Sequence, residues 1–214
     1  MKSGRQDDHG RVPGIFDLGL IALAVVYLAF IGVSGVGSDL YSSTDRVTDD
    51  GRVWLLVTSA LNVVSTLATV QWILLAAAVA FTMFRLGPRI WWTVAIAGHI
   101  GAAIISYAVI EFAIAVGSQS ADHTAAQADY GVSIVLAATL GALTASALPF
   151  RRPAGDPMDS GDRAALWIGL VGLAGMVIVS FGWYDVQHPL GYAIGFLLGG
   201  WLRSRPGWQM KFMG

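Results

Sequence analysis

Long stretches without a charged residue constrain this chain more strongly than any other feature of its sequence. The longest, residues 53–84, contains no Asp, Glu, Lys or Arg. As a single helix it would be about 48 Å long, whereas the hydrocarbon core of a membrane is about 30 Å thick. We therefore expect two pieces, an interfacial or re-entrant segment at residues 53–64 and a membrane-spanning helix at residues 65–84.

Further apolar runs of spanning length are separated by polar linkers. Charged residues make up 13% of the chain, whereas soluble domains carry about 25%, so the composition favours a membrane protein over a soluble domain. The sequence predicts an all-α membrane protein, a six-helix bundle at residues 15–203 between polar tails at residues 1–14 and 204–214. The spans expected besides residues 65–84 are residues 18–36, 90–116, 130–150, 164–183 and 189–202.

Basic residues alternate from one linker to the next. They occur in the N-terminal tail, in the second and fourth linkers and in the C-terminal tail, whereas the first, third and fifth linkers are poor in them. Because Arg and Lys near span ends collect on the cytoplasmic side, this pattern predicts that both termini lie inside. The first apolar run is too long for the core of a signal peptide, so we expect it to be retained as the first span.

Composition also bounds the chemistry and the partners. The chain has no cysteine, which excludes disulfides and thiol catalysis. Its formal net charge is −1, so nothing indicates nucleic-acid binding. The partners expected are the lipid bilayer and a transmembrane protein.

Small residues form one stripe along the fourth span and another along the sixth. Residues four apart lie on one face of a helix, and small residues on a face let a second membrane helix approach closely. We therefore expect the two spans to dock, with the glycines as packing positions. The stripes are Ser133, Ala137, Gly141 and Ala145 in the fourth span, and Gly191, Gly195 and Gly199 in the sixth.

Docking of these stripes would bring two catalytic residue types together. Ser133 lies near the outer end of the fourth span, and His188 lies three residues before Gly191 at the outer end of the sixth. A histidine that accepts the proton of a serine hydroxyl makes the serine a nucleophile. Ser133 and His188 are thus the candidate catalytic pair, and the alternative for this serine is helix packing.

Three other ionisable residues are candidates for supporting roles. His99 lies 17 residues before the expected end of the third span, or about 25 Å. We therefore expect it in the inner half of the membrane as a structural hydrogen-bond donor, with a proton relay as the alternative. Glu111 is closer in depth to Ser133 and is expected to face a cavity or the interface, with a role in orienting His188 or binding substrate as the alternative. Asp129 is expected to cap the fourth span.

These residues resemble the rhomboids, a family of intramembrane serine proteases with a six-helix core. Rhomboids carry a Gly-x-Ser-Gly motif at the start of span four and a histidine followed by glycines in span six. The stretch VWLLVTSALN at residues 53–62 resembles the segment leading into span two, and the resemblance is strongest to divergent bacterial members with Asp-x-Gly-Val-Ser and Gly-His-x-Gly-Ala stretches. The matching stretches here are Gly131-Val132-Ser133-Ile134, His188-Pro189-Leu190-Gly191 with Gly195 next, residues 129–133 and residues 98–102.

The resemblance covers residues 15–203 and carries expectations of its own. It implies that Ser133 attacks a peptide bond of a transmembrane substrate near the outer leaflet, and that His188 acts as general base and then general acid. It implies that no metal or cofactor is needed, and that the membrane is a bacterial plasma membrane.

The chain also departs from the family pattern. Active rhomboids place a His and an Asn, four residues apart, near the start of span two, where they are understood to stabilise the oxyanion. Residues 61–73 hold no histidine, and their only amides are Asn62 and Gln71. Ile134 replaces the glycine after the serine, and Pro189 disfavours helical geometry at His188. The alternative is therefore a catalytically inactive rhomboid-like protein that binds transmembrane helices or acts as an accessory subunit, and a transporter comes third.

Overall fold

The computed structural model describes residues 14–34, 41–62, 68–129, 131–148, 158–179 and 186–205. These residues are almost entirely helical, and the extended pairing within them is an isolated antiparallel bridge between Ser42 and Asp129. A helix satisfies its backbone N–H and C=O groups internally, as an apolar segment in a membrane must. The all-α class predicted from the sequence is confirmed.

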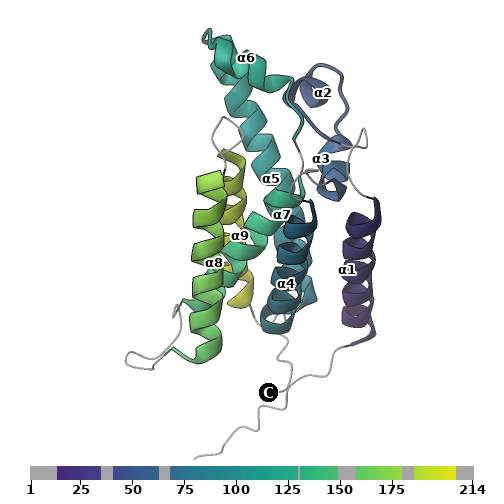
Figure 1. Ribbon diagram of the computed structural model, residues 1–214, viewed down its shortest axis with the longest axis vertical. Coiled ribbons are helices and arrows are strands. Elements are labelled where there is room, and N and C mark those ends of the chain that lie inside the picture. Colours follow the sequence, from purple (N-terminus) through teal and green to yellow (C-terminus); the bar gives the residue numbers. More distant parts are fainter. Residues whose placement is uncertain are drawn as a thin grey trace, which may run out of the picture.

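Among the described residues, six long helices occupy the positions of the predicted spans (Figure 1). Three of them, α1, α4 and α5, contain stretches long and apolar enough to cross a membrane. By contrast, α7 has 16 residues, and α8 and α9 begin with polar turns, so length and composition alone identify fewer spans than the six expected. The six helices are α1 (Ile15–Ser34), α4 (Ala68–Leu86), α5 (Pro88–Ala115), α7 (Val132–Ala147), α8 (Ser160–Val179) and α9 (Gln187–Arg203).

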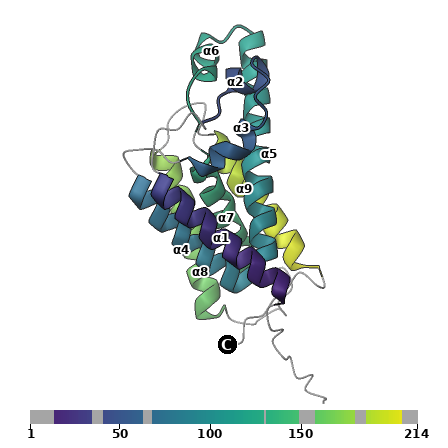
Figure 2. The same ribbon diagram turned by 90° about the vertical axis from the view of Figure 1, so that its right-hand side faces the viewer.

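The central element of the bundle is α7. It contacts α4, α5, α8 and α9 and lies between them in both ribbon views (Figures 1 and 2). Every residue of α7 is buried except Ser133, which is half-buried. A helix that is apolar all round is suited to such a position, so the half-buried serine is an exception that calls for explanation.

The glycines of α9 pack directly on α7. A Cβ on Gly195 would collide with the carbonyl oxygen of Ala138, and one on Gly199 would lie 2.8 Å from the Cβ of Ala142. The residues of α7 that meet these glycines, Ala138 and Ala142, each lie one position after a residue of the predicted stripe. Gly141 of that stripe still contributes, because a Cβ there would collide with the carbonyl of Tyr192. The small residues thus let the two backbones approach, as expected for membrane helices.

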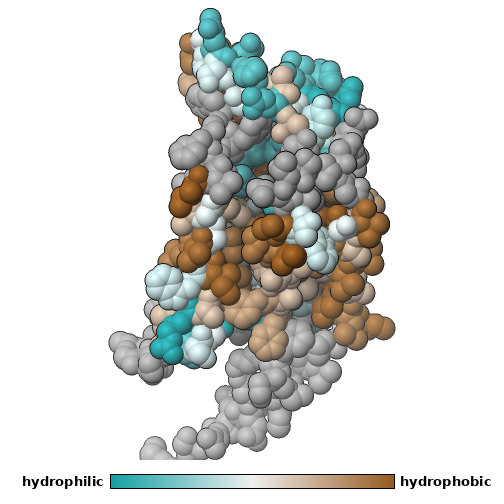
Figure 3. All heavy atoms as spheres, viewed as in Figure 1, coloured by the Kyte–Doolittle hydropathy of each residue, from teal (hydrophilic) through white to brown (hydrophobic). Residues whose placement is uncertain are grey.

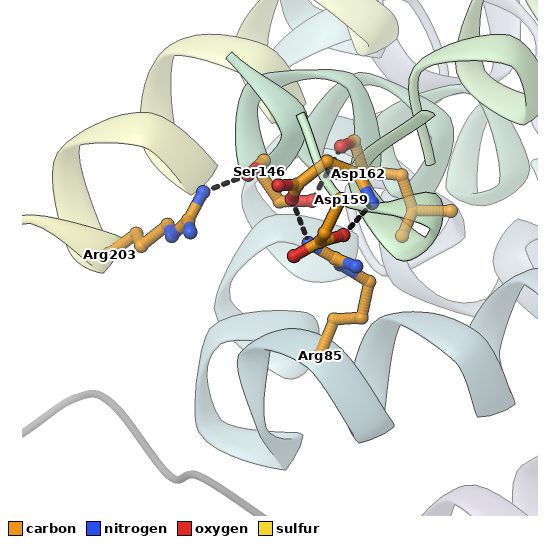
Figure 4. Close-up of polar contacts among 6 residues, drawn as sticks. Arg85, Ser146, Asp159, Asp162 and Arg203 are labelled. Atoms are coloured by element: carbon orange, nitrogen blue, oxygen red, sulfur yellow. Dashed lines mark hydrogen bonds and ion pairs between the residues drawn. The ribbon is translucent and has the colours of Figure 1, made fainter. Parts of the chain in front are cut away.

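Polar contacts tie the helix ends together at one end of the bundle. Arg89 Nε donates to Asp17 Oδ1 over 2.7 Å and joins α5 to α1. Arg85 forms an ion pair with Asp162 that joins α4 to α8, and Arg203 donates to a carbonyl at the end of α7 (Figure 4). Helices α1, α5 and α8 begin at this end, whereas α4, α7 and α9 finish there, so the long helices alternate in direction.

A polar cap covers the opposite end, above α4 and α7 (Figure 1). The segment expected to precede span two forms short helices at this level, separate from α4. Hydrophilic residues gather over α2 and α6 and again at the start of α8, with hydrophobic surface between them (Figure 3), which is the pattern of a membrane protein. The cap consists of α2 (Thr44–Thr48), α3 (Leu55–Thr58), the 3-10 helix η1 (Ser59–Leu61) and α6 (Gln119–Ala125).

Candidate active site

Ser133 and His188 form a hydrogen-bonded pair at the cap end of the bundle. The distance between His188 Nε2 and Ser133 Oγ is 2.9 Å. Each is the second residue of its helix, α7 or α9, and both side chains are half-buried. The docking of the two helices therefore brings together the two residues that the sequence analysis selected.

His188 is helical, contrary to the expectation from the proline that follows it. Helix α9 begins at Gln187, with Val186 as its N-cap, so Pro189 is the third helical residue. The first N–H groups of a helix have no intrahelical acceptor, so proline is tolerated in the first turn. The local bias against helix before proline is overridden, and His188 is held on the helix itself.

The residues that begin α7 place backbone amides beside Ser133. Gly131 is the N-cap, and its N–H donates to the carbonyl of Ser59 over 3.1 Å. The N–H groups of Ile134 and Val135 donate to the Gly131 carbonyl. The backbone amides of Val132 and Ser133 are therefore the first of the helix, where the partial positive charge of the helix N-terminus favours a negative group.

His99 lies at the level of Gly131, so the depth expected for it is wrong. A Cβ on Gly131 would collide with the His99 imidazole, and His99 Nε2 is 3.2 Å from Ser59 Oγ. The depth was misjudged because α5 has 28 residues and its last turns project past the bundle into the cap (Figure 2). Both His99 and Ser59 are buried, so this second Ser–His pair is closed to a substrate.

Glu111 is remote from the candidate pair. It lies on α5 about 18 Å beyond His99 along the helix axis, and its Oε1 accepts a hydrogen bond from Thr48 Oγ1 in α2 over 2.9 Å. The expectation that Glu111 matches Ser133 in depth is therefore wrong, for the same reason as for His99. Its position on the projecting part of α5 gives it a role in the polar cap.

Asp129 does not cap α7, because the N-cap residue is Gly131. Its side chain is buried, and Tyr107 donates to Asp129 Oδ2 over 2.9 Å. Burial raises the pKa of Asp129 to about 6, against the opposing effect of its polar neighbours Tyr107, Gln187 and Ser42. None of these three neighbours was predicted from the sequence. Only Gln187 carried a signal that could have selected it, its place beside His188.

Ile134, which replaces the motif glycine, packs between α7 and α9. Its side chain is buried, and its Cγ2 would lie 2.9 Å from a Cβ on Gly191. Within the described ranges, no three His, Asp or Glu residues gather closely enough to hold a metal ion.

Comparisons with family models, with curated proteins and with solved structures give no match for this chain. The site is therefore interpreted from its own geometry. The fold and the site together define a helical protein with membrane-type surface and a serine–histidine pair at the polar end of its central helix.

Proposed function

We propose that this protein is an intramembrane serine protease of rhomboid type, with six spans and both termini inside. The observation that carries the proposal is the 2.9 Å hydrogen bond between Ser133 Oγ and His188 Nε2. It joins a nucleophile to a base at the outer ends of two packed helices, within reach of a transmembrane substrate. The half-exposed position of Ser133, alone among the residues of α7, supports the same function.

The chemistry follows from the positions of the two side chains. His188 takes the hydroxyl proton of Ser133 as Oγ attacks the scissile carbonyl, and the tetrahedral intermediate carries the negative charge. Its collapse breaks the C–N bond, and the protonated His188 gives its proton to the leaving amine. Water, activated by His188, then hydrolyses the acyl-enzyme and restores Ser133.

The oxyanion would be stabilised by the start of α7. The amides of Val132 and Ser133 head that helix beside the nucleophile, and a helix N-terminus binds anions well. They stand in for the His–Asn pair, four residues apart, that residues 61–73 lack. Loss of one oxyanion donor costs other serine proteases about 10²–10³ in rate, so we expect a slow enzyme.

A fluorophosphonate probe tests the nucleophile in detergent-solubilised protein. Wild-type protein should be labelled, whereas Ser133→Ala and His188→Ala should lose labelling while remaining folded. Ser120→Ala is the matched control, because Ser120 is an exposed serine of the cap, and it should label like the wild type. Full labelling of Ser133→Ala would place the reactive group elsewhere and overturn the proposal.

The alternative function is that of a catalytically inactive rhomboid-like protein that binds transmembrane helices. The absence of a histidine from residues 61–73 favours it. A folded wild-type protein that takes up no probe would support this alternative. Crosslinking in the native membrane should then recover a specific transmembrane partner, and failure to recover one would count against it.

A further inference from the structure

We propose that Asp129 is a positioning residue for the Ser133–His188 pair, because it ties the approach to α7 to the cap segment, residues 41–62, and to α5. This inference rests on the proposed function. It assigns to one buried acid the task of holding the start of α7 where Ser133 Oγ meets His188 Nε2.

The contact between Asp129 and the cap is made by backbone and side chain together. Ser42 N–H donates to the Asp129 carbonyl over 3.1 Å, and Asp129 N–H donates to the Ser42 carbonyl over 2.7 Å. The Tyr107 hydroxyl lies 2.8 Å from Ser42 Oγ and 2.9 Å from Asp129 Oδ2. One buried cluster thus joins the cap segment, α5 and the approach to α7.

The same cap segment holds the chain on the other side of residue 130. Ser59, at the start of η1, accepts the Gly131 N–H and contacts His99. Residues 129 and 131 are therefore both attached to residues 41–62, immediately before α7 begins. The position of Ser133, two residues further on, is set by these two attachments.

Gln187 extends the cluster to α9. Its side chain is buried and faces the Asp129 carboxylate, with an interaction that favours the charged acid. Among the described residues its Nε2 meets no acceptor at full hydrogen-bond geometry. Gln187 directly precedes His188 at the start of α9, so the cluster lies beside the first turn of the helix that carries the histidine.

A carboxylate suits this position because it offers two acceptor oxygens. An ionised Asp accepts hydrogen bonds through about four lone-pair sites, and the Tyr107 hydroxyl bonds to one of its oxygens. An alanine at position 129 would remove this acceptor while leaving the backbone bridge to Ser42. An asparagine would keep one acceptor oxygen and most of the shape.

Inactivation kinetics with the fluorophosphonate separate positioning from folding. For Asp129→Ala we expect the first-order inactivation constant to fall about 10–100-fold, as a displacement of about 1 Å can cause, with the probe's reversible binding constant little changed. Asp129→Asn should recover most of the rate. Asp122→Ala, which removes an exposed acid of α6, is the matched control and should match the wild type.

A second measurement makes this inference independent of catalysis. The ¹⁵N and ¹³C chemical shifts of the His188 imidazole report its bond to Ser133, and Ser133→Ala defines their values without that bond. Asp129→Ala should move the His188 signals toward those of Ser133→Ala, whereas Asp122→Ala should not. If the His188 signals of Asp129→Ala coincide with those of the wild type, the positioning role is wrong even where the wild type is labelled.

The two proposals can therefore fail separately. A wild type without labelling overturns the protease, and the His188 signals still decide whether Asp129 holds the pair. If Asp129→Ala does not fold, Tyr107→Phe removes one hydrogen bond to the carboxylate and keeps the ring. It should shift the His188 signals in the same direction, and unchanged signals in a folded Tyr107→Phe protein would overturn the inference.

Discussion

At the scale of single residues, the site depends on where two side chains fall within the first turns of their helices. Ser133 and His188 are each the second residue of a helix. Successive residues of a helix differ in direction by about 100°, so a shift of one position would turn either side chain away. The 2.9 Å bond between them is consequently sensitive to the residues that set where each helix begins, among them the buried Asp129.

The raised pKa of Asp129 predicts a specific dependence of stability on pH. Burial raises its pKa from 3.8 to about 6, so folding favours the protonated form. Its contribution to stability is complete below about pH 3.8 and is lost as pH rises through 6. We expect the melting temperature of the wild type in detergent to fall between pH 4 and 7, relative to Asp129→Asn, by the equivalent of about 2–3 kcal/mol.

The comparison with Asp129→Asn cancels the titration of the other acids, which both proteins share. Parallel melting curves for the two proteins across this pH range would contradict the assigned environment of Asp129. A wild type that gains stability relative to the variant as pH rises would reverse the sign and contradict it more strongly.

At the scale of helices, the contact between α7 and α9 decides the geometry of the site. The glycines of α9 meet the backbone and small side chains of α7, with Gly195 against the Ala138 carbonyl. Backbone atoms in a packed bundle cannot move aside as a flexible side chain can, so this contact tolerates no Cβ. The interface therefore fixes how far apart the first turns of the two helices lie.

Replacement of Gly195 by Ala should separate α9 from α7. Overpacking of a filled contact costs about 1–3 kcal/mol, and we expect a lower melting temperature together with a loss of probe labelling at Ser133. Gly175→Ala is the control, because a Cβ on Gly175 in α8 would meet nothing within 4 Å. A Gly195→Ala protein as stable and as reactive as Gly175→Ala would contradict the packing described for α9.

At the scale of the whole molecule, the two ends of the bundle have different tasks. One end is closed by ion pairs between helices distant in sequence, as between Arg85 of α4 and Asp162 of α8 (Figure 4). The opposite end carries the polar cap and the candidate site (Figure 1). The hydrophobic surface between the two ends is of the kind that a membrane would cover.

Removal of Arg85 should destabilise the entire bundle. Asp162 is 1% exposed in its side chain, and an acid left buried without its partner costs about 3–5 kcal/mol. Arg52→Ala is the control, because Arg52 and Asp50 form an exposed pair worth about 1 kcal/mol or less. Unfolding in detergent measures both free energies, and equal losses in the two variants would show that the Arg85–Asp162 ion pair is not a structural contact.

Much of this protein follows from local properties of its sequence. The uncharged runs determine where the long helices form, the linker charges predict their orientation, and the small-residue stripes single out the two helices that dock. These signals also selected Ser133 and His188, because residue type and helical spacing are readable without coordinates.

Only the tertiary structure decided how far each helix extends beyond its neighbours and which buried polar groups meet. The projection of α5 past the bundle brings His99 to Gly131 and carries Glu111 away from the site. The cluster of Asp129 with Tyr107 joins residues from separate segments. Such contacts depend on how far each helix is shifted along its neighbours and on the course of the loops between them. Packing across the whole bundle sets both, so the local pattern of residues does not predict them.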